Sequence, residues 1–156
     1  MMMDEGATRP MLNIQKIDHV GIRVKDRDRA VAFYERLGFE TKAEGIFTKG
    51  HPIIMQHPCG IVINVLGPAN ASEGTNILMD IDDKHAGYTH MALRVDSLSE
   101  TRAFLEKHDI AITGTMDFGD LHAVFIRDPD RNVIELDEYP NAQPGTRTEG
   151  DYAEHP

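Results

Sequence analysis

Two histidines and one glutamate occupy matching positions of an internal repeat, and together they have the chemistry of a divalent-metal site. The segments IDHVGIRV and GYTHMALRV are two copies of one pattern, and the offset between them pairs His19 with His90 (90 − 19 = 71). The same offset later pairs Asn64 with Glu135 (135 − 64 = 71). Two neutral imidazoles and one carboxylate form a facial set of ligands that leaves coordination positions free for substrate or oxygen, which suits Fe(II), Mn(II) or Zn(II).

The alternative for either histidine alone is a hydrogen-bonded residue on a polar sheet face, and for a single histidine this would be the better explanation. The matched pair, together with a carboxylate at the matched end position, favours the metal site. The amide of Asn64 would add only a weak oxygen ligand as a fourth position, or would contact a substrate. Gly21 and Ala92 follow the histidines in the same phase, and such small residues would leave room for a bound molecule.

The strands that carry these residues determine which way they point. The strand expected over Ile17–Val24 alternates apolar residues with polar or small ones, and His19 is in the polar phase. In the last strand of each copy the apolar neighbours take the core face, so Asn64 and Glu135 turn to the other side. We therefore expect both histidines, the amide and the carboxylate to converge on one concave face.

Each copy is expected to contain a strand, a helix and three further strands. Asp26 and Ser97 are the predicted N-caps of the two helices, and Gly38 ends the first helix. The strands expected in the first copy are Ile17–Val24, Phe39–Phe47, Ile53–Gln56 and Ile61–Leu66. The second copy is expected to contain strands over Tyr88–Val95, Ile110–Met116, His122–Arg127 and Asn132–Tyr139, with its helix over Leu98–His108.

The composition indicates one domain in which the repeat forms two modules. The chain has 156 residues, of which 40% are hydrophobic, so it can bury one core of ordinary size. A net charge of −10 without a basic stripe argues against a nucleic-acid partner. Cys59 is the only cysteine and is explained best as an incidental turn residue in a reducing, cytoplasmic compartment. No long apolar run predicts a signal peptide or a membrane anchor.

The segments outside the strands and helices differ in composition from the repeat. We expect a flexible arm over residues 1–13 and a flexible tail over residues 140–156, with one domain between them over residues 14–139. Within that domain, module 1 spans about 14–67 and module 2 about 87–139. The linker between them, about 67–86, is rich in Pro, Asn, Ser, Gly and Asp, which is typical of a connector or a mobile flap.

These residues resemble the vicinal oxygen chelate superfamily, which includes glyoxalase I, methylmalonyl-CoA epimerase, fosfomycin-resistance proteins, extradiol dioxygenases and bleomycin-binding proteins. The resemblance rests on DHVGIRV followed by AFYERLGF, on THMALRV followed by AFLEKHDI, and on RDPDRNVIEL, where Arg131 replaces the usual glycine. It covers Ile17–Tyr139 and implies an α+β fold of two tandem βαβββ modules, whose curved mixed sheets form a cup with the helices outside. It also implies a metal held by the first and last strands of each module.

The resemblance implies a metal-dependent enzyme whose small substrate chelates the metal through two neighbouring oxygens, by isomerase, lyase or ring-cleaving dioxygenase chemistry. Fe(II) or Mn(II) is favoured, and Zn(II) or Ni(II) is compatible. Asn64 differs from the glutamate of glyoxalase I, and Phe125 replaces the tyrosine of the dioxygenases. The alternatives are a bleomycin-resistance type of small-molecule binding protein and a metal-bound structural module, neither with turnover. Members commonly build each cup from two chains, so we expect a homodimer.

Four further residues are candidates for substrate binding, and no catalytic residue is assigned. Arg23 and Arg94 share the phase of the histidines, and would hold an anionic substrate or neutralise carboxylates across the sheet. His122 would act as a proton shuttle near pH 7, or would lie at the rim. Asp137 shares the outward phase of Glu135, and would line the mouth of the cup or simply end a polar strand.

Overall fold

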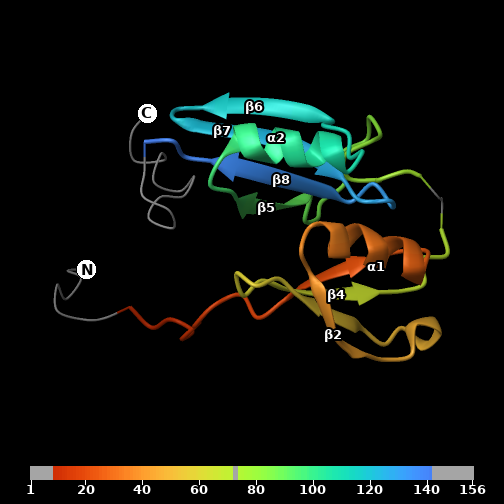
Figure 1. Cartoon of the computed structure of the whole chain (residues 1–156). Coiled ribbons are helices and arrows are strands. Elements are labelled where there is room, and N and C mark those ends of the chain that lie inside the picture. The colour runs from red at the N-terminus through yellow and green to blue at the C-terminus, as the bar shows by residue number, and fades with distance from the viewer. Residues whose placement is uncertain (1–8, 72–73, 142–156) are drawn as a thin grey trace.

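Each half of the repeat forms a four-stranded mixed sheet with one helix packed on it (Figure 1). The computed structural model describes residues 9–71 and 74–141. Module 1 contains β1 (Val20–Arg23), α1 (Arg27–Arg36), β2 (Glu40–Glu44), a short 3-10 helix (Phe47–Lys49), β3 (Ile53–Gln56) and β4 (Val62–Leu66). Module 2 contains β5 (His90–Arg94), α2 (Leu98–Lys107), β6 (Gly114–Phe118), β7 (Leu121–Arg127) and β8 (Val133–Glu138). The order confirms the predicted α+β fold of two βαβββ modules.

The first and last strands of each module lie side by side and run parallel. β1 pairs with β4 and β5 pairs with β8, and the other two strands of each sheet follow in antiparallel pairing. Gly21 lies opposite Asn64, and Ala92 lies opposite Glu135, which is the correspondence that the offset of 71 predicts. Equivalent residues of the two copies therefore occupy equivalent places in two separate sheets.

Both helices begin at the residues that the sequence predicts. The side chain of Asp26 accepts a hydrogen bond from the backbone N–H of Arg29 at 2.8 Å, and the hydroxyl of Ser97 accepts one from that of Glu100 at 3.1 Å. These bonds satisfy donors of the first turn that have no partner within the helix. Gly38 follows α1 with a φ of 103°, a conformation that glycine adopts without strain.

Several strands have limits that differ from those expected, and β1 begins at Val20 rather than at Ile17, so that His19 precedes it. β6 begins at Gly114 rather than at Ile110, because Ile110 and Ile112 pack against the core from an irregular segment instead of a strand. β2 ends at Glu44, because Phe47 begins the 3-10 helix. Ile110, Ile112 and Phe47 therefore contribute to burial without joining the sheets.

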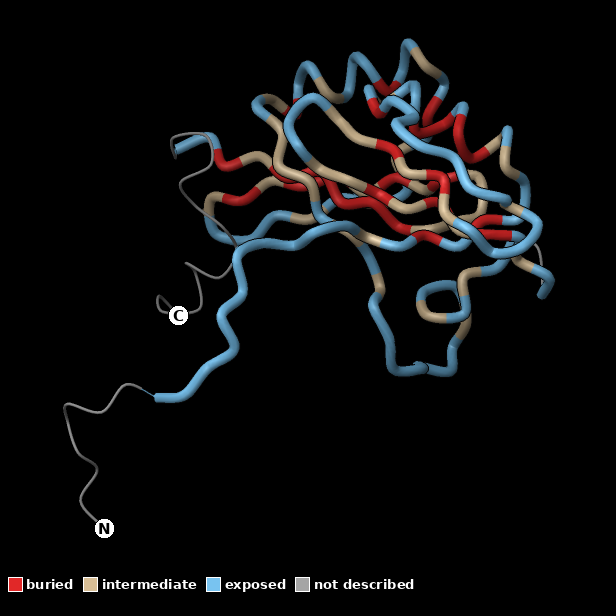
Figure 2. Tube along the Cα trace, turned by 90° about the horizontal axis from the view of Figure 1, so that it is seen from below, coloured by how far each residue is buried: buried red, intermediate tan, exposed pale blue. Residues whose placement is uncertain are grey.

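One hydrophobic core runs through both modules. A single buried cluster contains Val24, Phe33 and Tyr34 of module 1 together with Leu105 and Leu136 of module 2. Figure 2 shows that the buried residues are concentrated along the sheets and on the inner sides of the helices. The described part of the N-terminal arm extends away from the two modules and is exposed. The two modules thus complete each other's core.

Polar contacts also join the two modules, between module 1 and the β7–β8 turn, and we call this set the polar seam. The hydroxyl of Tyr34 donates to Oδ2 of the buried Asp128 at 2.7 Å. Nη2 of Arg29 binds Oδ1 of Asp130 at 3.0 Å. Nδ2 of Asn132 donates to the carbonyl of Arg23 at 3.2 Å. The five-residue β7–β8 turn of module 2 therefore binds both β1 and α1 of module 1.

The described part of the linker is tied to the same turn. The carboxylate of Asp80 accepts hydrogen bonds from Nε and Nη2 of Arg131 at 2.7 and 3.0 Å, and Nη2 of Arg127 lies 3.1 Å from it. The Arg131 guanidinium holds the pKa of Asp80 well below its usual range. Nδ2 of Asn76 donates to the Arg131 carbonyl at 3.0 Å. This stretch of the linker is thereby fixed to module 2.

Parts of the expected arm, linker and tail are not among the described residues. Residues 1–8, 72–73 and 142–156 fall outside the structure's description. Over the remainder of the chain, no helix has the length and apolarity that crossing a bilayer requires.

Candidate functional site

His90 and Glu135 meet on the face of the second sheet that points away from α2. Nε2 of His90 is 2.9 Å from Oε2 of Glu135. The glutamate is almost completely buried, with 2% of its surface exposed, although it carries a carboxylate. Its other oxygen, Oε1, is buried and has no hydrogen-bond partner among the described residues. An unpaired carboxylate oxygen in such a position costs free energy unless a cation or a donor completes it.

The residue before each histidine hydrogen-bonds to its ring. Oγ1 of Thr89 lies 2.8 Å from Nδ1 of His90, and Oδ2 of Asp18 lies 2.7 Å from Nδ1 of His19. Such a bond fixes the orientation of the ring and, when Nδ1 is the donor, leaves the lone pair of Nε2 for a cation. Sequence reasoning missed this pair, although the offset of 71 relates Asp18 to Thr89 and would have found it.

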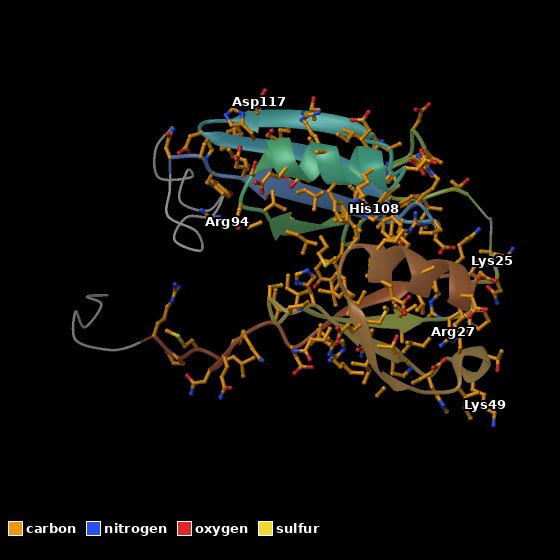
Figure 3. All side chains as sticks on the ribbon, in the orientation of Figure 1. Lys25, Arg27, Lys49, Arg94, His108 and Asp117 are labelled. Atoms are coloured by element: carbon orange, nitrogen blue, oxygen red, sulfur yellow. The ribbon has the colours of Figure 1, made fainter. Side chains whose placement is uncertain are left out.

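Two further groups line the same face around the carboxylate. Phe125 is the partner of Glu135 in β7, and its ring centroid lies 6.1 Å from that of His90. The guanidinium of Arg94 lies over the ring of Tyr139 at 4.6 Å from its centroid, at the end of β5 remote from the linker (Figure 3). Asp137 is buried opposite Arg94 in the register. A cationic group and an aromatic floor therefore lie near the buried carboxylate.

Module 1 carries the other predicted residues. His19 precedes β1, and its side chain is 44% exposed beside Asp18. Asn64 is half-buried on the face of the first sheet that lies opposite α1, between Gly21 and Ile54 in the register. Arg23 is exposed on the same face. The sequence predicted that the histidines would converge, but among residues 9–71 and 74–141 no three His, Cys, Asp or Glu side chains are placed to hold one metal ion.

The candidate ligands are carried by two sheets. Each module keeps its own four-stranded sheet, and the modules are joined by one shared core and by the polar seam. One chain therefore presents two half-sites. One half-site contains His19 and Asn64, and the other contains His90 and Glu135.

His122 lies on the opposite face of the second sheet from Glu135. It alternates with Ala123 and shares the phase of Val124, which belongs to the core beneath α2. Nδ1 of His122 lies close to Oδ1 of Asp117 on the neighbouring β6, a residue at the outer edge of the molecule (Figure 3). It is therefore not placed to contact a molecule bound at Glu135.

A cavity of about 480 Å³ opens beside His90. Its walls come from β1, from Tyr88 to Met91, from the β7–β8 turn and from the linker around Asn76. The volume lies in the range of small-molecule sites, about 300–1,000 Å³. The fixed stretch of the linker thus forms one wall of a space next to His90.

The residues of the second half-site fit a divalent cation. One imidazole nitrogen and one carboxylate are donors that Fe(II), Mn(II) and Zn(II) share, and the unpartnered Oε1 of Glu135 has the charge that such a cation would neutralise. Two protein ligands are one fewer than the three that open metal sites commonly use. A third donor must therefore come from elsewhere.

Comparison with known proteins identifies the family to which the chain belongs. The chain is a member of the Glyoxalase/Bleomycin resistance protein/Dioxygenase superfamily, whose profile matches residues 16–136. The glyoxalase domain-containing protein RDO1 of Mycosarcoma maydis is 26% identical over 145 residues, which cover 85% of this chain and 73% of RDO1.

Solved structures share the fold. A glyoxalase family protein from Enterococcus faecalis is 25% identical with a TM-score of 0.65, and the match covers 80% of this chain and 98% of that one. TnmS3, an antibiotic binding protein from a Streptomyces species, is 20% identical with a TM-score of 0.62, covering 82% of this chain and 98% of its own. These matches confirm the predicted superfamily and its two-module fold.

Proposed function

We propose that this protein is a divalent-metal-dependent enzyme acting on a small substrate that binds the metal through two neighbouring oxygens. The observation that carries the proposal is the buried Oε1 of Glu135, which has no partner among the described residues beside the Nε2 of His90. Superfamily membership supports the same function. A buried carboxylate is retained at a cost in stability, and binding a cation is a reason to retain it.

His90 and Glu135 would hold the metal from one chain, and His19 of the partner subunit would supply the third ligand. The proposal therefore includes a homodimer, because within the described residues of one chain no three His, Cys, Asp or Glu side chains are placed to hold one metal ion. Asn64 of the partner subunit would stand at the fourth position or contact the substrate. A neutral amide there leaves one negative charge in the ligand set, which favours an anionic chelating substrate and Fe(II) or Mn(II).

The bound metal would supply Lewis acidity toward the oxygens of the substrate. The chain's own groups would do the rest. Arg94, held over Tyr139, would orient an anionic group by charge-assisted hydrogen bonds, and Phe125 would exclude water on the other side of the carboxylate. Arg23 of the partner subunit would face the same space.

The second candidate function is small-molecule binding without turnover. It is favoured by a small buried apolar cluster on the same face, made by Leu121, Ala123 and Tyr139 with Met116 against it. Such a floor suits a hydrophobic ligand. TnmS3, which shares the fold, binds an antibiotic. Turnover of a chelating substrate by the metal-loaded protein would separate the two functions.

Metal content provides the first test. Wild-type protein is loaded with Mn(II) or Fe(II), and bound metal is measured after gel filtration in His19→Ala, His90→Ala and Glu135→Ala. We expect each substitution to abolish binding, while His122→Ala, on the opposite face, binds as wild type does. A wild-type protein without metal affinity, or full binding by Glu135→Ala, would refute the site.

Mixing two inactive variants tests the dimer. In a site built across two chains, His19→Ala mixed with His90→Ala forms heterodimers in which one site is intact, so the mixture recovers about a quarter of the wild-type metal content. If each site lies within one chain, the mixture recovers none. Light scattering should give a dimer, and a monomer that still binds metal would contradict this part of the proposal.

A further inference from the structure

The repeat allows the two sides of the contact between the modules to be compared residue by residue. On one side the polar seam fills the space, with the Tyr34 hydroxyl on Asp128 and the Arg29 guanidinium on Asp130. These bonds connect the helix of module 1 to the β7–β8 turn of module 2. On the other side, the helix of module 2 faces the β3–β4 turn of module 1.

The corresponding residues on that other side make no such bonds. Leu105 and His57 take the places of the Tyr34–Asp128 pair (34 + 71 = 105; 128 − 71 = 57). Glu100 and Cys59 take the places of the Arg29–Asp130 pair (29 + 71 = 100; 130 − 71 = 59). An aliphatic side chain and a carboxylate have replaced the phenol and the guanidinium, so nothing on this side can repeat the seam.

A cavity of about 580 Å³ lies at this place, and we call it the α2 cavity. Its walls are mainly apolar, and its polar groups come from the start of α2 and from the β3–β4 turn. The apolar lining residues are Leu37, Phe39, Ile61, Leu93, Val95, Phe104, Leu105 and Leu136. It shares no lining residue with the cavity beside His90. It is therefore a separate space of a size that holds a small ligand.

The charged groups at the α2 cavity are chiefly acidic. Asp96 and Glu100 line it, and neither carboxylate has a hydrogen bond or ion pair with another described residue. The hydroxyl of Ser97 is used to cap α2, and that of Thr101 donates to the Ser97 carbonyl at 2.7 Å. Two carboxylates outweigh the roughly half positive charge of a helix N-terminus, so the cavity attracts a cation.

Two other polar residues line the cavity, Arg94 and His57, and the negative charge of Asp96 and Glu100 remains. Arg94 contributes to the lining, but its guanidinium lies over the ring of Tyr139. Nδ1 of His57 accepts the backbone N–H of Cys59 at 3.0 Å, which fixes the imidazole against the turn. Within the described residues no three His, Cys, Asp or Glu side chains come together to hold a metal ion. An organic cation fits the cavity better than a metal.

We infer that the α2 cavity binds a small organic cation with an apolar body, whose ammonium or guanidinium group lies between Asp96 and Glu100. The apolar body would pack on Leu105 and on Phe104, which is 38% exposed. The charged head would take the role that the Arg29 guanidinium has in the polar seam. This site does not depend on the proposed metal site.

Cys59 supplies the assay, because it is the only cysteine, is exposed and lines the cavity. The rate of its alkylation by iodoacetamide is measured with 3-phenylpropylammonium, with the neutral 3-phenylpropanol and with the anionic 3-phenylpropionate. The ammonium ion is expected to slow alkylation in a saturable way, whereas the alcohol and the anion leave the rate unchanged. Equal protection by the alcohol would overturn the proposal.

Substitutions locate the binding group. Asp96→Asn and Glu100→Gln should each weaken protection by about tenfold, as loss of a charge-assisted bond predicts. Glu106→Gln, on the same helix but outside the cavity, is the matched control and should leave protection intact. Circular dichroism checks that each variant is folded. Unchanged protection in folded Asp96→Asn and Glu100→Gln would refute the site. Protection should persist in His90→Ala, so a failed metal site would not affect this result.

Discussion

Replacing Tyr34 by phenylalanine tests whether the polar seam stabilises the fold. Tyr34 is completely buried, and its ring packs at centroid distances of 5.1 and 5.9 Å from Phe33 and Phe39, contacts that a phenylalanine ring would keep. The substitution removes one hydrogen bond to the buried carboxylate of Asp128. A bond of this kind contributes about 2 kcal/mol, so the free energy of unfolding should fall by about that amount. For a chain of this size the melting temperature should fall by about 4–8 °C.

The effect should depend on pH in a defined direction. Burial raises the pKa of Asp128 above its usual 3.8, while hydrogen bonds from Asn132 and Tyr34 act to lower it. The folded state therefore holds this proton more tightly than the unfolded state, and the stability from this group falls as pH rises from 3.8 through the folded pKa. Since Tyr34 stabilises the ionised carboxylate, the difference between wild type and variant should be largest above that pKa and small below it.

Tyr34 itself adds a second limb at alkaline pH. Burial and the neighbouring Asp128 raise the pKa of its phenol well above the usual 10.0. Wild-type stability should therefore fall above pH 10, as the unfolded phenol ionises and the folded one does not, and Tyr34→Phe should lack this part of the loss.

Urea unfolding followed by circular dichroism at several pH values measures these differences. Tyr88→Phe is the control, because Tyr88 is fully exposed and its change should stay within about 0.5 kcal/mol. If Tyr34→Phe unfolds like the control at pH 7, or loses the same free energy below pH 3.8 as above it, the assigned role of the bond to Asp128 is wrong.

Two other substitutions have defined expected outcomes. Asp80→Asn removes the carboxylate that binds Arg131, and should cost about 1 kcal/mol near neutral pH and expose the linker to proteases. Because the pKa of Asp80 is depressed, its contribution is present above 3.8 and is lost as pH falls, so the variants should converge in acid. Asn64→Glu should tighten Mn(II) binding in calorimetry, through a second carboxylate in the ligand set. Weaker Mn(II) binding would contradict the placement of Asn64.

The repeat made much of the fold predictable from the sequence. A constant offset and the alternation of apolar residues fix which residues share a sheet face. A strand shifted by one residue would move every one of its side chains to the other face, including the apolar ones that form the core. The pairing of His90 with Glu135 follows from this register. For His122 the sequence left two roles open, a proton shuttle or a rim residue, and the phase of β7 places its imidazole on the side of α2.

What the sequence did not predict concerns the contact between the modules. A register defines a sheet but not how two sheets pack, so the sequence could not show that the described residues of one chain place no three candidate ligands together. Asp128 lies in RDPDRNVIEL, a segment that carries the family resemblance, yet the bond from Tyr34 to Asp128 spans 94 positions and has no local pattern. The late start of β6 has a different cause. Ile110 is a residue type common in strands, but it is buried in the core without belonging to a strand.

The polar seam also bears on the order in which the chain can fold during synthesis. Tyr34 leaves the ribosome 94 residues before Asp128, so α1 is made long before the turn that receives its hydroxyl. Until then, Tyr34 and the module 1 part of the shared core remain without their cover. Contacts so distant in sequence slow folding, because a long loop must close before they form. Module 1 is thus expected to wait, incompletely packed, until nearly all of module 2 has been translated.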